Sequence, residues 1–554
     1  RGPMSAIYGN HAGGVIQMFT PDGKGAPSVE GSFAAGSYGT WKSDISAQGE
    51  IGGIGYVIDA SRFATDGYRD HSAAERRQLN AKLRLDATEQ TQVTVVMNLF
   101  DQPLSLDPLV LTRAQFEANP RQAVTASTQF KAGKDVSQQQ VGLVLDHRLD
   151  GAASVMARVY AGQRDLDNRL AFAGSGARSA GGVVQLDRSY DGLGLRYTRR
   201  LPAGEGQVQL SVGLDHERMG EHRQGYINNL GVQSDPKRDE QDSVHSTGVY
   251  AQAEWAINED WSALAGLRAN RVAFRVTDAF IPGDNPDDSG TASFSATNPV
   301  LGITRHLSAD TNLYANIGRG FETPTFTELA YTAGGTGPNL GLRSARSTHA
   351  EVCRKTQLAE GQRLDVALFH ITTRDEIVVA TSEFGRTIYT NAGKTRRSGV
   401  ELSHAAQWTP EWRSLLALST LMAEFAEAFT SSSGAVVAAG NRIPGILDRT
   451  LFAELAWQPR AWAGFTGALE LVHRGSMVVN DLNEDRTDAV TLFNLRLVWQ
   501  QTVGAWTLRE TLRVDNLTDR AYVGSVIVND GNKRYFEPAP GRQWGLGLTA
   551  TYRF

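Results

Sequence analysis

Apolar and polar residues alternate strictly along residues 544–554, the last eleven of the chain. One face carries Trp544, Leu546, Leu548, Ala550, Tyr552 and Phe554, and the other carries Gln543, Gly545, Gly547, Thr549, Thr551 and Arg553. Successive side chains of a β-strand point to opposite faces. An apolar outer face and a polar inner face are typical of a membrane β-barrel strand, because its outside meets hydrocarbon. The pattern predicts that this segment is the closing strand of such a barrel.

The same alternation recurs along the chain after the first twenty-odd residues. Clear examples are Val93, Val95, Met97 and Leu99; Val249, Ala251, Ala253 and Trp255; and Thr491, Phe493, Leu495, Leu497 and Trp499. Breaks rich in Gly, Asp, Asn or Pro separate these segments, as expected between strands. Counting the segments from Val29 onward predicts about 22 strands, an even number, as closed antiparallel bacterial barrels prefer.

The breaks alternate between short and long. Residues 50–53, 258–260 and 501–504 form short breaks, whereas long ones include 102–136, 219–242, 321–342 and 516–540. Short turns at one rim and long loops at the other are the layout of an outer-membrane barrel. A soluble β-sandwich or propeller predicts no such difference between two rims. We therefore expect an all-β, transmembrane antiparallel β-barrel.

Composition narrows the class of protein further. The chain of 554 residues has no run of 18 or more apolar residues, which excludes membrane-spanning helices. Its net charge is −5 with no basic block, which argues against nucleic acid as a partner. A single cysteine, Cys353, excludes an internal disulfide and a cysteine-based metal site. Tryptophans and tyrosines near strand ends predict the aromatic girdles of a membrane protein.

A barrel of about 22 strands has a lumen too wide to fill with its own side chains, so we expect a plug. Only the segment before the first predicted strand could belong to a plug domain. The sequence opens with no signal peptide, which a secreted barrel needs. We expect residues 1–26 to be the C-terminal end of an N-terminal plug domain with its linker, and residues 27–554 to form the barrel. The chain is then a mature or truncated piece of a longer protein.

Three blocks resemble the TonB-dependent outer-membrane receptors. The first is Arg1-Gly2-Pro3, Tyr8-Gly9 and Gly13-Gly14-Val15-Ile16, which is similar to the end of the receptors' plug. The second runs from Gly320-Phe321-Glu322-Thr323-Pro324-Thr325 through Pro338-Asn339-Leu340 to Glu351, with Ser344-Ala345 in place of the usual Pro-Glu. The third comprises residues 391–401, 514–529 and 534–542. This third block most resembles the branch that imports pyrroloquinoline quinone, formerly labelled a probable iron receptor.

The resemblance implies active import of a scarce small ligand across the bacterial outer membrane, with pyrroloquinoline quinone first and a ferric siderophore second as the ligand. It implies coupling to the TonB-ExbB-ExbD complex through a TonB box that is missing from this chain and expected upstream of Arg1. It also implies contact with outer-membrane lipid and lipopolysaccharide, a monomeric state, and no cofactor.

Ligands of this kind are negative and planar, so arginines to bind carboxylates and aromatic rings to stack are the expected contacts. The ligand-binding candidates, chosen by their place in long loops or on the inner face, are Arg319, Phe321, Arg374, Arg386, Arg397, Lys533, Arg534 and Tyr535. The alternative for each is an ion pair within the loops or to the plug. For Arg397 that partner is expected to be Glu401, which shares its inward face.

Two other function classes remain as alternatives. A passive porin predicts fewer strands, an inward-folded constriction loop and no plug. An outer-membrane enzyme needs a nucleophile and a base at one rim, but the chain has no Gly-x-Ser-x-Gly, His-Glu-x-x-His or P-loop motif. Asp287-Asp288-Ser289-Gly290 faintly resembles a protease nucleophile segment, yet its Asp- and Gly-rich setting favours a turn. We therefore expect neither catalytic residues nor metal ligands.

Overall fold

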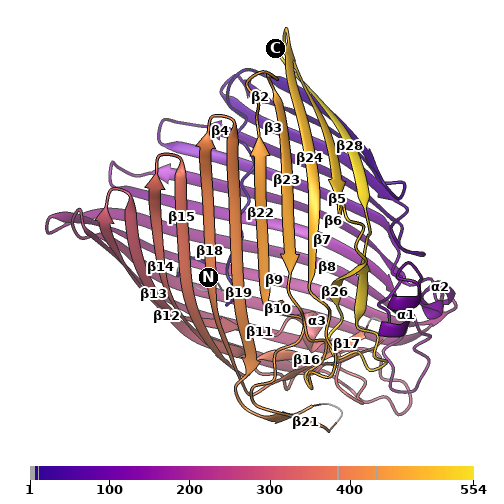
Figure 1. The fold of residues 1–554 in the computed structure, drawn as a ribbon. Helices are drawn as coiled ribbons and strands as arrows, with labels where there is room; N and C mark the ends of the chain where they lie inside the picture. The colour runs from indigo at the N-terminus through magenta and orange to yellow at the C-terminus, as the bar shows by residue number, and fades with distance from the viewer. Residues whose placement is uncertain (1–5, 10–11, 384–385, 432–433) are drawn as a thin grey trace.

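A closed antiparallel β-barrel is the architecture of the computed structural model (Figure 1), which describes residues 6–9, 12–383, 386–431 and 434–554. In this described part of the chain, 22 strands form one sheet, and β1 (Ser28–Gly36) pairs with β28 (Gln543–Arg553) to close it. The predicted fold class and strand number are confirmed. No helix in the described residues is long and apolar enough to cross a membrane.

The strands follow one another around the barrel in chain order. Between β1 and β28 the barrel strands are β2 (Trp41–Ile51), β3 (Ile54–Thr65), β4 (Ala74–Asp86), β5 (Thr91–Ser105), β6 (Gly133–Arg148), β7 (Ala153–Arg169), β8 (Val183–Ala203), β9 (Gly206–Asn229), β10 (Val232–Ala256), β11 (Trp261–Asp278), β12 (Gly290–Ser308), β13 (Thr311–Glu322), β14 (Ala345–Ala359), β15 (Gln362–Arg374), β18 (Lys394–Thr409), β19 (Trp412–Phe425), β22 (Arg449–Trp457), β23 (Phe465–Arg474), β24 (Val490–Val503) and β25 (Trp506–Asp515).

Alternation of side chains explains why these segments form a membrane barrel. In β28 the outward residues Trp544, Leu546 and Leu548 are 51%, 54% and 49% exposed, as the apolar face of the closing strand predicts. Leu548 lies beside Phe33 of β1, which is also exposed. In water such side chains would be buried, whereas here they form a lipid-facing belt.

The two rims differ as predicted. At one rim the strands are joined by tight turns, such as the turn between β2 and β3. The other rim carries α1 (Arg113–Ala118), α2 (Thr125–Gln129), α3 (Phe326–Leu329) and the hairpins β16 (Ile377–Glu383) with β17 (Arg386–Asn391), β20 (Phe429–Thr430) with β21 (Val436–Val437), and β26 (Tyr522–Val526) with β27 (Phe536–Ala539). Figure 1 shows these elements gathered at one end of the barrel, opposite the C-terminus.

One predicted loop is largely strand. Residues 219–242 were expected to form a long loop, but β9 continues to Asn229 and β10 begins at Val232, so only a tight turn separates them. Glu221 pairs directly with Asp242 in this extension. The prediction was wrong because a strand that rises above the lipid has polar residues on both faces. Its backbone pairing continues although the apolar alternation has ended.

The described N-terminal residues contact the inner wall. The backbone N–H of Ala6 donates to Gln252 Oε1 at 2.9 Å, and Ala6 packs with Tyr250 and Val300. Arg268 donates to the carbonyl oxygens of Ala6 and Ile7. The first barrel strand begins at Ser28. The division into a plug segment, residues 1–26, and a barrel, residues 27–554, stays a prediction, and Arg1-Gly2-Pro3 lies outside the described residues.

Candidate functional site

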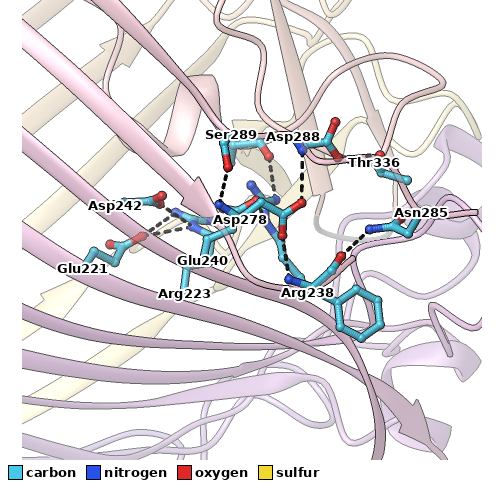
Figure 2. Close-up of polar contacts among 12 residues, drawn as sticks. Glu221, Arg223, Arg238, Glu240, Asp242, Asp278, Asn285, Asp288, Ser289 and Thr336 are labelled. Carbon is cyan, nitrogen blue, oxygen red and sulfur yellow. Dashed lines mark hydrogen bonds and ion pairs between the residues drawn. The ribbon is translucent and has the colours of Figure 1, made fainter. Parts of the chain in front are cut away.

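Charged side chains line the inner wall of the barrel on β9 and β10, where these two long strands extend beyond the shorter strands (Figure 2). Arg223 Nη2 lies 2.8 Å from Glu221 Oε1, and Arg223 Nε lies 3.6 Å from Asp242 Oδ2. Arg238 Nε lies 2.7 Å from Glu240 Oε1. All five side chains are buried, with 6% or less of each exposed. Buried charges of both signs compensate one another, so loss of one partner is costly.

The β11–β12 loop is fixed to this wall by Asp278 (Figure 2). Asp278 Oδ1 accepts from the backbone N–H of Phe280, and Oδ2 accepts from that of Asp288 at 3.1 Å. Thr336 in the β13–β14 loop (323–344) donates to Asp288 Oδ2 at 2.6 Å. The Asp287-Asp288-Ser289-Gly290 segment thus ends a loop and begins β12, in keeping with the predicted turn.

The β13–β14 loop packs against the inner face of β11. Its helix α3 starts at a capping box, in which Thr325 and Glu328 satisfy each other's backbone N–H groups. Phe326 and Leu329 of α3 then pack on Val272, Phe274 and Val276, which are inward residues of β11. The Phe274 and Phe326 rings meet edge to face, with centroids 5.2 Å apart. This burial places the rest of the loop beside the charged wall.

Tyr331, just after α3, lies between two guanidinium groups. Arg238 lies 5.5 Å and Arg386 4.5 Å from the centre of its ring, and Arg238 Nη1 also donates to the carbonyl oxygen of Ala330 at 2.7 Å. Burial by itself raises the pKa of the phenol, but the positive charges of Arg386, Arg223 and Arg238 outweigh it and lower the pKa of Tyr331. Three guanidinium groups therefore act together on the Tyr331 phenol.

A second group of loops is held together by the last long loop, which contains β26 and β27. Phe536 is 1% exposed and forms a β-bridge with Leu111 of the β5–β6 loop. Arg113 lies 4.7 Å from the centre of the Phe536 ring and pairs with Asp485 at 2.5 Å. Arg69 of the β3–β4 loop, 3% exposed, pairs with Glu537 at 2.9 Å. We name these residues the last-loop cluster.

Three candidates chosen from the sequence lie on barrel strands rather than in the long loops. Arg319 shares the outer face of β13 with Ile317, since the neighbouring residues Gly318 and Gly320 are buried on the inner face, where Gly320 faces Ala12. Arg374 shares the outer face of β15 with Leu368, which is 54% exposed. Phe321 is 1% exposed at the end of β13. Alternation along a strand decides the placement of the two arginines, and it places neither of them with the other candidates.

The remaining candidates are spread over the loop rim. Arg397 faces inward, but its ion-pair partner is Glu376, at 2.7 Å, rather than the expected Glu401. Glu376 lies in the loop just before β16. The alternation of residues along β18 alone did not indicate this partner for Arg397. The last loop holds the other three: Lys533 is exposed at a turn, the Arg534 N–H donates to Asp530 Oδ1 at 3.0 Å, and Tyr535 is packed with Val479 and Phe536.

Arg386 is the candidate that the structure places at the mouth, where it joins residues that the sequence alone did not single out. Its neighbours are Tyr331, Phe172 and Arg238, and Arg223 acts on Tyr331 as well. A signal existed for the wall, since Arg238, Glu240 and Asp242 fall on one face of a strand, but the lack of apolar alternation in this segment predicts a loop. No local pattern indicates the contacts made by Tyr331 and Phe172.

Comparison with known proteins gives one family and several relatives. The model of the family described as TonB dependent receptor-like, beta-barrel matches residues 82–517. The metal-pseudopaline receptor CntO of Pseudomonas aeruginosa (strain UCBPP-PA14) is 22% identical over 469 residues. The match covers 76% of this chain and 63% of that receptor, so the chain spans less than two thirds of this curated relative.

Solved structures share the fold. The unliganded ferric citrate transporter FecA has a TM-score of 0.81 at 18% identity, covering 100% of this chain and 82% of that chain. The ferric yersiniabactin uptake receptor FyuA from Yersinia pestis has a TM-score of 0.79 at 16% identity, covering 100% of this chain and 84% of that chain.

Proposed function

Because this chain belongs to the family of TonB-dependent receptor-like β-barrels, which lie in the bacterial outer membrane, we propose that it imports a scarce anionic small molecule by energy-coupled transport. The long-loop rim then faces the outside and the short-turn rim faces the periplasm. The observation that carries the proposal is the stack of Arg386 and Arg238 on Tyr331, on loops that fold into the barrel mouth. Guanidinium groups and rings are the contacts that a planar, carboxylated ligand needs.

A metal chelate is the first ligand class. The related proteins are described as receptors or transporters of metal-pseudopaline, ferric citrate and ferric yersiniabactin. Arg386, Lys533 and Arg534 are the proposed ligand contacts from the candidate set, because they lie on the loop rim. Arg397 is a weaker choice, since Glu376 already neutralises it.

Pyrroloquinoline quinone is the second candidate. The observation that favours it is the sequence of the third block, residues 391–401, 514–529 and 534–542, which resembles the quinone-importing branch. The quinone and a citrate-type metal chelate both present several carboxylates, and the quinone adds a planar ring system. The same arginine contacts therefore suit both, and the aromatic contacts suit the quinone in addition.

The proposal extends to partners. The TonB-ExbB-ExbD complex would supply the energy, through a TonB box outside this chain, and lipid and lipopolysaccharide would surround a monomeric barrel. The outward apolar belt, with Trp499, Trp506 and Trp544 near strand ends, supports contact with a bilayer.

Uptake by cells tests the proposal. The full-length receptor is expressed in a Gram-negative strain that lacks its own receptors for the ligands, with and without TonB. We expect saturable, TonB-dependent uptake of a radioiron chelate and sub-micromolar binding of that chelate. Binding of the quinone without the chelate would select the second candidate. Uptake that is linear in concentration and unchanged without TonB would instead indicate a passive porin.

A further inference from the structure

Three cations lie side by side on the outer face of the barrel, at the strand ends that meet the long loops. Arg346 of β14 pairs directly with Arg374 of β15, and Arg374 pairs directly with Lys394 of β18. Figure 1 shows these three strands as neighbours in the wall. We name Arg346, Arg374 and Lys394 the cationic row. On its own strand, each shares the outer face with an exposed apolar residue of the lipid-facing belt: Val352, Leu368 and Val400.

The row has no carboxylate of this chain to balance it. Like charges directly opposite each other on neighbouring strands, which are roughly 4.8 Å apart, destabilise the sheet. Among the residues whose side chains the structure describes, no carboxylate lies within ion-pair distance of the row. Asp375, next to Arg374 in the sequence, pairs instead with Arg343 at 2.8 Å. Arg346 Nη2 donates to a neutral acceptor, the carbonyl oxygen of Ser295, at 3.2 Å. The row therefore favours an anion from outside the chain.

A second level of polar groups lies one residue pair closer to the apolar belt. Arg319 of β13 pairs with Thr348, Thr348 pairs with Thr372, and Thr372 pairs with Arg396 of β18. Arg396 forms an ion pair with Glu424, whereas Arg319 has no carboxylate within ion-pair distance in the described part of the chain. A guanidinium group and two hydroxyl groups thus lie beside the row, on the same face, and can donate to further oxygens of a bound anion.

Another sector of the outer face carries the opposite charge. Asp101 of β5 pairs with Ser137, Ser137 pairs with Asp165, and Asp165 pairs with Asp187 of β8. A general attraction to a negative membrane surface favours cations around the whole rim. The rim instead has an acidic side and a cationic side, so the cationic row is a local site. These acidic positions also share their strand faces with exposed apolar residues: Leu99, Val141, Val159 and Leu193.

We propose that the cationic row binds a phosphate group of the glycolipid of the outer leaflet, a phosphorylated glucosamine lipid of the lipid A class. The row lies where the apolar belt ends, which is the height of a lipid headgroup. Guanidinium forks and an ammonium group match phosphate oxygens, and a phosphate between them removes the repulsion within the row. Arg319, Thr348 and Thr372 contact the remaining headgroup oxygens, while the acyl chains lie along the apolar belt.

The site rests on one part of the proposed function, the outward orientation of the long-loop rim. It is independent of the imported ligand, because the row faces lipid and not the lumen. It also gives a role to Arg374 and Arg319, which strand alternation removes from the lumen.

Lipid binding by the full-length receptor in a neutral maltoside detergent tests the site. Native mass spectrometry measures binding of bisphosphorylated lipid A, of the same lipid without its phosphates, and of inorganic phosphate. Arg346→Gln combined with Arg374→Gln is expected to weaken lipid A binding about 30-fold, at about fivefold per cation. The dephosphorylated lipid should bind the unmodified receptor as weakly as lipid A binds the double variant.

Unfolding by urea in the same detergent separates binding from a structural role. Without lipid A, the double variant should unfold at a higher urea concentration than the unmodified receptor, because the repulsion between Arg346 and Arg374 is gone. With lipid A present, the order should reverse, since only the unmodified receptor gains the stabilisation of a bound ligand. A purely structural role of the two arginines gives the same order in both conditions.

Arg77→Gln is the matched control. The Arg77 side chain is also on the outer face and is 52% exposed, but it pairs with Glu75 at 2.8 Å. Its loss should change lipid A affinity by less than about twofold. Equal lipid A binding by the double variant and the unmodified receptor would overturn the site, as would equal binding of the dephosphorylated lipid. Inorganic phosphate that displaces lipid A at equal concentration would indicate a free-anion site and overturn it as well.

The site and the proposed function can fail separately. An unmodified receptor that binds lipid A through the row but takes up no ligand would refute only the proposed function. One that shows energy-coupled uptake but no phosphate-dependent binding of lipid A would refute only the site.

Discussion

Asp481, in the loop between β23 and β24, is a buried carboxylate whose charge should weaken the last-loop cluster at neutral pH. It is 5% exposed, and its Oδ2 accepts from Asn529 Nδ2 at 2.9 Å, whereas Oδ1 has no hydrogen-bond partner in the described residues. Asn529 also donates to the carbonyl oxygen of Val379, so the β16–β17 hairpin is joined at the same point. Burial raises the pKa of Asp481 to about 6, while the bond from Asn529 opposes the shift only in part.

The sign of the pH dependence follows from this direction. A carboxyl with a raised pKa in the folded loops binds a proton more tightly there than in opened loops, where its pKa is about 3.9. The loops are therefore most stable below pH of about 4 and lose stability as the pH rises through about 6. A shift of about two units corresponds to about 3 kcal/mol of local stability lost at pH 8.

Asp481→Asn removes the charge and keeps the shape. The amide oxygen still accepts from Asn529, while the new NH₂ group costs about 1 kcal/mol if it finds no acceptor, so we expect a net gain of about 2 kcal/mol at pH 8. That gain equals about 30-fold slower opening in exchange of residues 476–490 and 526–531, after correction for intrinsic rates. The variant should also lose the pH dependence. Asp485→Asn is the matched control, because it breaks the ion pair with Arg113 and should loosen the loop slightly.

Two results would refute this reasoning. One is equal corrected protection of the unmodified loops at pH 4.5 and pH 8. The other is faster exchange of Asp481→Asn at pH 8, which would mean that the carboxylate stabilises the loops through a partner.

Two further predictions concern the barrel. Leu548→Arg places a charge on the lipid face and should lower the free energy of unfolding in a bilayer by about 2–4 kcal/mol, whereas Thr549→Arg on the inner face should lower it little. Urea unfolding in lipid vesicles measures both variants, and equal losses of stability would contradict the assigned faces. Arg268→Met removes the ion pair with Asp215, at 2.9 Å, and the bonds to Ala6 and Ile7. It should cost about 3–5 kcal/mol and expose residues 6–9 to exchange, whereas Arg271→Met on the outer face should not.

The sequence alone determined the barrel because the information for a membrane strand is local. Each segment carries its own alternation, and chain order fixes its neighbours, so the closing strand, the strand number and the two unlike rims could all be predicted. Strand segments that extend beyond the bilayer have no lipid-facing side, so the apolar alternation that predicts a strand is missing from them. Residues 219–242 therefore looked like a loop although β9 and β10 continue through them.

Tertiary structure alone decided the site. Arg386 meets Phe172 and Tyr331 across three loops, and Arg397 pairs with Glu376 rather than with Glu401 on its own strand. Arg319 and Arg374 are as cationic as Arg386, but strand alternation places them on the outer face. Loop contacts are chosen by packing among segments distant in the sequence, so no periodicity within any one loop encodes them. The barrel could be derived from residue patterns, whereas the partners of each loop arginine required the folded chain.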